Sequence, residues 1–97
     1  MKKQVINTEN RQFLYEAILK LQNLEECEAF FEDLCTVQEL ESISQRLVVA
    51  KLLTEDKVYT DIVDRTGAST ATISRVNRTL QSGKDGYSII FNRFSGK

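Results

Sequence analysis

The chain has 97 residues, of which 41% are hydrophobic and 28% charged, and its formal net charge is −1. This composition is typical of one soluble globular domain and excludes a disordered chain. The sequence has no histidine, and its two cysteines, Cys27 and Cys35, lie eight positions apart. This pattern excludes the usual zinc sites, a CxxC redox motif and the usual general base of an enzyme. With no stretch of about 18 uncharged apolar residues, we expect a cytoplasmic protein with no membrane segment, no enzymatic activity, no metal or cofactor, and reduced, half-buried thiols.

The first half of the chain predicts three helices, and an all-α fold is favoured because the sequence has no proline and only four glycines. Apolar residues recur at helical spacing over about 9–22 and again over 24–34. Residues 36–39, Thr-Val-Gln-Glu, form a capping box that starts a third helix ending near residue 54. The expected buried stripe of this third helix is Leu40, Ile43, Leu47, Ala50 and Leu53.

The second half predicts two short helices joined by a tight turn. A polar break at residues 54–57 precedes a helix over about 59–66, and Gly67 supplies the positive φ that such a turn needs. Ser69 is a good N-cap for the next helix, whereas Val58 offers no capping side chain to the first one. The expected inward-facing residues of this pair are Ile62, Val63, Ile73, Val76 and Leu80.

A last short helix is expected over residues 86–95, after a loop rich in glycine and polar residues. Its three aromatic residues, Tyr87, Phe91 and Phe94, favour packing over a free tail. The whole chain is thus expected to be a single domain over residues 1–97. Core helices would occupy about 9–54 and 86–95, and a helix-turn-helix would occupy about 58–81.

Charge is distributed unevenly along the chain. Residues 1–59 carry eleven acids and seven bases, whereas residues 60–97 carry three acids and six bases. From Thr66 to Lys84 there are three cations and no acid. Because a DNA-binding surface needs a local basic face and not a basic protein, this segment is a candidate DNA surface. An alternative is a protein-interaction adaptor that uses the acidic surface between Glu25 and Glu41.

The outward face of the second short helix is polar and basic. In a helix-turn-helix, the first residues of the second helix approach base edges in the major groove, where hydroxyls form hydrogen bonds and methyls contact thymine. Arginines further along the helix reach phosphates. The same residues could also be only helix caps and solvated charges. The candidate DNA-binding residues are Thr60, Ser69, Thr70, Ala71, Thr72, Ser74, Arg75 and Arg78.

Residues 67–80, Gly-Ala-Ser-Thr-Ala-Thr-Ile-Ser-Arg-Val-Asn-Arg-Thr-Leu, strongly resemble the recognition segment of Trp-repressor-like proteins. The match is closest to the YerC/YecD branch, and it extends back through the capping box and residues 44–53 and forward to residues 85–87. The resemblance implies an intertwined all-α homodimer that binds palindromic double-stranded DNA and regulates transcription, as a repressor.

The resemblance also implies a place for a ligand. In the family, the corepressor tryptophan lies between the long core helix and the recognition helix, held by two arginines that match Arg46 and Arg75. Tryptophan-responsive members have glycine where this chain has Val76, whose isopropyl group would occupy part of the pocket. Tryptophan is therefore not expected as the corepressor. The candidate ligand-binding residues are Thr36, Arg46, Arg75 and Val76.

Overall fold

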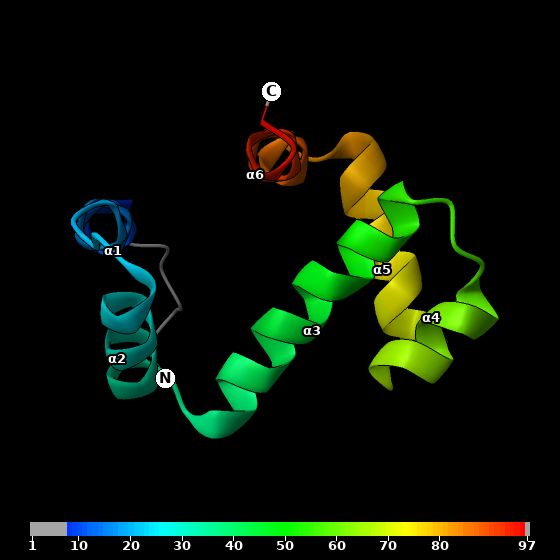
Figure 1. The fold of residues 1–97 in the computed structure, drawn as a ribbon, viewed down its shortest axis with the longest axis horizontal. Coiled ribbons are helices and arrows are strands. Elements are labelled where there is room, and N and C mark those ends of the chain that lie inside the picture. The colour runs from blue at the N-terminus through cyan, green and yellow to red at the C-terminus, as the bar shows by residue number, and fades with distance from the viewer. Residues whose placement is uncertain (1–7, 97) are drawn as a thin grey trace, which may run out of the picture. The chain divides into compact units, whose positions relative to one another are not determined.

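The computed structural model describes residues 8–96 and is all-α, as predicted (Figure 1). Its helices are α1 (Thr8–Leu19), α2 (Leu24–Leu34), α3 (Val37–Thr54), α4 (Tyr59–Thr66), α5 (Thr70–Ser82) and α6 (Gly86–Phe94). Each corresponds to one of the six helices expected from the sequence. Among the described helices, none is long and apolar enough to cross a membrane.

The chain divides into two compact units, Met1–Val37 and Gln38–Lys97. The first unit contains α1 and α2. Asn23 caps α2, since its side-chain oxygen accepts a hydrogen bond from the Glu26 amide at 2.8 Å. In return, the Glu26 carboxylate accepts one from the Gln22 amide at 2.9 Å. Cys27 and Cys35 are half-buried free thiols, as expected.

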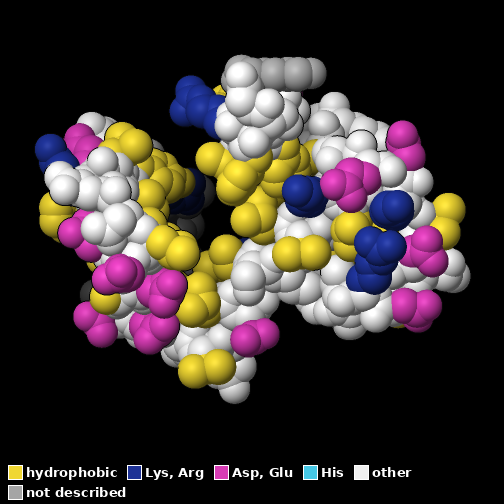
Figure 2. All heavy atoms as spheres, in the orientation of Figure 1, with side chains coloured by type: hydrophobic (Ala, Val, Ile, Leu, Met, Phe, Trp, Pro, Cys, Tyr) yellow, Lys and Arg dark blue, Asp and Glu magenta, His cyan; other side chains and the backbone are white. Residues whose placement is uncertain are grey.

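Neither α1 nor α2 contains a buried residue. Large apolar side chains are instead exposed on both helices, including Leu19 and Leu24, which are 82% and 74% exposed. The acids of α2 gather on its surface (Figure 2). Within their own unit, these two helices therefore leave an apolar face largely uncovered.

The second unit has an apolar core where α4, α5 and the turn between them pack against the C-terminal half of α3 (Figure 1). Tyr87 and Phe91 of α6 pack against this core and stack on each other, with ring centroids 5.9 Å apart. Ile62 and Ile73 are fully buried at its centre. The buried residues of this core are Val49, Ala50, Leu52, Ile62, Ala68, Ile73 and Val76.

The expected buried stripe of α3 is only partly correct. Ala50 is buried, but Ile43 and Leu47 are 43% and 41% exposed, whereas Val49 and Leu52 are buried instead. The reason is that the α4–α5 pair packs against the side of α3 that carries Gln45, Val49 and Leu52. At 100° per residue, Ile43 and Leu47 project from the opposite side of the helix.

Candidate nucleic-acid interface

The turn between α4 and α5 depends on Gly67, which has the left-handed φ of 72° that the sequence predicted. Its amide donates to the Val63 carbonyl at 2.8 Å and so closes α4. Because a Cβ built on Gly67 would meet nothing within 4 Å, the backbone conformation, and not lack of space, selects glycine here.

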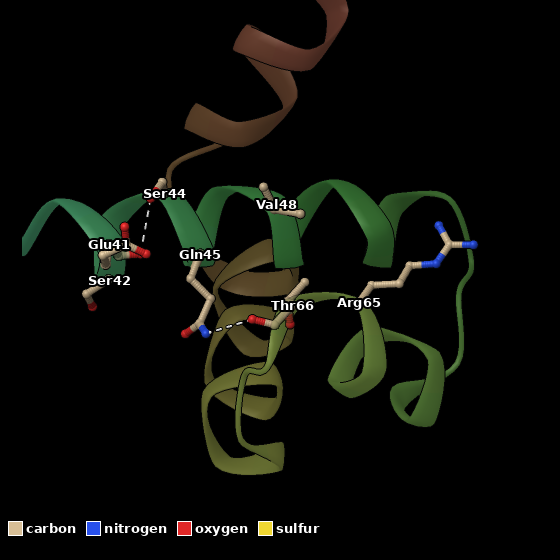
Figure 3. Close-up of a pocket in the computed structure, with 7 residues that line it drawn as sticks. All are labelled: Glu41, Ser42, Ser44, Gln45, Val48, Arg65 and Thr66. Atoms are coloured by element: carbon tan, nitrogen blue, oxygen red, sulfur yellow. Dashed lines mark hydrogen bonds between the residues drawn. The ribbon is translucent and has the colours of Figure 1, made fainter. Parts of the chain in front are cut away.

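Thr66 fixes the turn on both sides. Its hydroxyl donates to the Ile62 carbonyl at 2.7 Å and accepts from the Ala68 amide at 3.1 Å. The side-chain amide of Gln45 donates to the Thr66 carbonyl at 3.1 Å, which ties the turn to α3 (Figure 3). A surface hollow of about 460 Å³ adjoins this contact, and Figure 3 shows Glu41 and Arg65 at its two ends.

Ser69 is the N-cap of α5, as predicted. Its hydroxyl accepts from the Thr72 amide and donates to the Thr72 hydroxyl, both at 3.1 Å. These two hydroxyls are thereby engaged in the cap. Val58 precedes α4 with no side-chain cap, which also agrees with the sequence.

The two short helices are held together by apolar and polar contacts. Ile62 of α4 and Ile73 of α5 are buried between them. The side-chain amide of Asn77 donates to the Tyr59 hydroxyl at 3.4 Å. Val76 is buried and Val63 and Leu80 are half-buried, so the predicted inward face is confirmed.

The outward face of α5 carries most of the candidate DNA-binding residues. Thr72 is half-buried, and Ser69 is exposed but engaged in the cap. Thr60 is exposed at the start of α4 and so does not belong to the outward face of α5. No acid occurs in α5. The exposed candidates on α5 are Thr70, Ala71, Ser74, Arg75 and Arg78.

A cavity of about 360 Å³ lies between α3 and α5. Three of the four predicted ligand-site residues, Arg46, Arg75 and Val76, line it, but Thr36 does not. The sequence analysis missed Thr79 and Tyr87. Thr79 follows Arg75 by one helical turn, a spacing that could have identified it. The position of Tyr87 depends on the path of the loop before α6, which leaves no periodic signal. The complete lining is Arg46, Thr72, Arg75, Val76, Thr79 and Tyr87.

Comparison with known proteins assigns this arrangement to a family. The profile of the family described as Trp repressor protein matches residues 9–95. The chain belongs to the Trp repressor family. It is 52% identical over 80 residues to YerC, an uncharacterised protein of Bacillus subtilis strain 168, across 82% of this chain and 77% of YerC.

Two solved structures share the fold of this Trp repressor family member. A candidate Trp repressor from Staphylococcus aureus matches with a TM-score of 0.86 and 52% identity, over 90% of this chain and 87% of that one. A Trp-repressor-like protein from Eubacterium eligens ATCC 27750 matches with a TM-score of 0.87 and 53% identity, over 90% of each chain. The Trp repressor family is a non-enzymatic DNA-binding family. Membership confirms the expected absence of enzymatic activity and agrees with a helix-turn-helix made of α4 and α5.

Proposed function

We propose that this protein is a homodimeric, sequence-specific DNA-binding regulator that represses transcription in the cytoplasm without tryptophan as corepressor. The observation that carries the proposal is the exposed, acid-free outward face of α5, held in a helix-turn-helix. In this arrangement Thr70, Ala71 and Ser74 approach base edges, and Arg78 reaches a phosphate. Family membership supports DNA as the partner.

A second copy of the chain is the proposed subunit partner. Large apolar side chains are exposed on α1, α2 and α6. A second copy would bury them, and a chain of this size buries more apolar surface by forming a dimer. The helix-turn-helix units of the two subunits, related by twofold symmetry, would enter successive major grooves about 34 Å apart. The proposed operator is therefore palindromic.

The buried position of Val76 supports regulation without tryptophan. Val76 is only 3% exposed and belongs to the core that joins α3 to α5. Tyr87 and Phe91 pack against the same core from α6. Side chains of the protein thus hold α5 against α3 beside the cavity that Arg46, Arg75 and Val76 line.

The first experiment is selection of bound sequences from randomised duplex DNA, with and without tryptophan. We expect the same palindrome in both conditions. Enrichment only with tryptophan would contradict ligand-independent binding. No enrichment in either condition would contradict DNA recognition and would favour the adaptor that uses the acidic surface between Glu25 and Glu41.

A variant pair tests the proposed face of α5. Replacing Arg75 and Arg78 with alanine should reduce the magnitude of the slope of log K against log salt by about one to two units per helix-turn-helix. The reason is that fewer phosphates are neutralised on binding, so fewer counterions are released. The matched control is Arg93→Ala, which removes a cation from the last turn of α6. An unchanged slope in the double variant would exclude these arginines from the interface.

Val76→Gly tests the role given to the isopropyl group. Removing it should weaken the apolar contact between α5 and α3 and lower the affinity for the selected operator in the absence of ligand. The conservative control, Val76→Ile, keeps an apolar side chain at the position. Thermal unfolding of both variants separates loss of folding from loss of DNA affinity. Full operator affinity in folded Val76→Gly would show that this contact does not position the helix-turn-helix for DNA binding.

A further inference from the structure

The surface hollow beside the contact between Gln45 and Thr66 carries opposite charges at its two ends. Glu41 of α3 lies at one end and Arg65 of α4 at the other (Figure 3). Both side chains are exposed, and within residues 8–96 neither forms an ion pair or a side-chain hydrogen bond with another residue. One free carboxylate and one free guanidinium favour a ligand that carries both an ammonium and a carboxylate group.

The middle of the hollow suits a peptide group. The Gln45 side chain donates one N–H to the Thr66 carbonyl, and in the described part of the chain its second N–H and its oxygen make no further hydrogen bond. Figure 3 shows this oxygen turned away from Thr66, toward the side on which Glu41 lies. One donor and one acceptor on the same carboxamide can pair with the C=O and N–H of a peptide bond. Val48 is 48% exposed and supplies an apolar wall.

The length of the hollow decides which zwitterion fits. Along α3 its lining runs from Glu41 to Val48, which is about 10 Å at about 1.5 Å per residue. Figure 3 shows Arg65 at the end where Val48 lies. The ammonium and carboxylate groups of a free amino acid share one carbon atom, so they cannot reach both ends. An extended peptide covers about 3.3 to 3.6 Å per residue, so about three residues match this length.

We propose that this hollow binds a short peptide with free termini, about three residues long. The ammonium group lies against Glu41, the carboxylate lies against Arg65, and a central peptide group pairs with Gln45. The volume of about 460 Å³ falls within the range of about 300 to 1,000 Å³ that is usual for small ligands. A bound peptide would join α3 to the last turn of α4, directly before the turn at Gly67.

This peptide site is separate from the cavity between α3 and α5. Arg46, the α3 residue of that cavity, projects about 100° from Gln45 around the helix. No residue lines both, and every residue that lines the hollow belongs to the unit Gln38–Lys97. Peptide binding therefore does not depend on the proposed DNA-binding function.

NMR titration of the nitrogen-labelled full chain with trialanine tests the site. The side-chain amide signal of Gln45 and the backbone amides of Val48 and Thr66 should shift together and saturate with one dissociation constant. We expect this constant to be millimolar, because the charged groups of the site are exposed and exposed ion pairs are weak.

Blocked peptides test each charged contact. N-acetyl-trialanine lacks the ammonium group, and trialanine amide lacks the carboxylate. Each should bind about fivefold more weakly than trialanine, the change expected for the loss of one exposed ion pair. Free alanine, which cannot span the hollow, should give no saturable shift.

Protein variants assign each contact to a residue. Glu41→Gln should weaken trialanine binding about fivefold and remove the difference between trialanine and its acetylated form. Arg65→Gln should do the same for the amidated form. The matched controls are Asp64→Asn and Lys51→Gln, because both residues are exposed and charged but do not line the hollow. Both controls should bind as the wild type does, and the spectra should show that all four variants fold.

Three results would overturn the proposal. The first is the absence of any saturable shift at the hollow with trialanine. The second is equal binding of the free and blocked peptides. The third is a set of shifts confined to the cavity between α3 and α5. None of these measurements involves DNA, so each result leaves the proposed function to be tested by duplex selection alone.

Discussion

At the scale of single residues, backbone conformation at Gly67 decides whether α4 can turn into α5. Its φ of 72° lies in the left-handed region, and the space around its Cα is open. Gly67→Ala should therefore destabilise the protein by about 1 kcal/mol through backbone strain alone. Urea unfolding measures the effect.

Gly86→Ala is the control for that prediction. Gly86 is the first residue of α6, and a Cβ there would also meet nothing within 4 Å, but its φ is not in the left-handed region. Alanine has the higher helix propensity, so this variant should keep or raise stability by up to about 1 kcal/mol. Equal destabilisation by both substitutions would contradict strain at Gly67.

The residues of the turn were predictable from sequence because local chemistry determines them. Glycine at a left-handed position and serine at an N-cap act through their own backbone neighbours, so Gly67 and Ser69 could be assigned without knowing the fold. The Gln45 contact with Thr66 joins residues 21 positions apart. No periodicity or spacing signals such a contact, and it became visible only in the structure.

At the scale of elements, α4 begins without a side-chain cap, which leaves room for a stabilising substitution. Val58 has the extended backbone typical of an N-cap, with φ −79° and ψ 158°, and is 61% exposed. Val58→Ser should supply the missing acceptor and raise the free energy of unfolding by about 0.5 to 1 kcal/mol. Val58→Ala, which removes the same methyl groups without adding an acceptor, should not stabilise.

Substitutions in the core between the helices should change the free energy of unfolding more than substitutions on the helix surface. Ile73 of α5 is fully buried, and Ile73→Ala should lower the free energy of unfolding by about 2 to 4 kcal/mol through lost burial and a residual cavity. The exposed neighbour Ser74 is the control, and Ser74→Ala should change stability by less than about 0.5 kcal/mol. A similar loss in both would contradict the observed orientation of α5.

Helix positions were predictable, but the burial of α3 was not. Periodicity identifies an apolar stripe without specifying which part of it the same chain covers. Ile43 and Leu47 fit the stripe and yet are exposed, because α4 and α5 pack against a different side of α3. The turn at residues 55–58, where Asp56 has a positive φ of 60°, leads the chain from α3 into α4.

At the scale of the whole molecule, exposed apolar side chains should make stability depend on protein concentration. Phe94 of α6 is 78% exposed. If a second copy covers it, Phe94→Glu should raise the dimer dissociation constant by about 100-fold or more, since each of two phenyl groups loses about 1.5 kcal/mol or more of burial. Sedimentation velocity across a concentration series measures this constant.

Asn92→Glu is the control, because it adds the same charge to an exposed position of the same helix. It should shift the dissociation constant much less than Phe94→Glu. A monomer at micromolar concentration in the wild type would contradict dimerisation altogether. Equal constants in all three proteins would place Phe94 outside the subunit contact.

The polar ties of the helix-turn-helix have a consequence for the speed of DNA recognition. The Ser69 cap, the Tyr59–Asn77 contact and the link from Gln45 to Thr66 fold and orient α5 before any partner arrives. Association then requires no coupled folding of this segment, so encounter and electrostatic steering should set its rate. Complex lifetime, rather than speed of capture, should distinguish a true operator from other DNA.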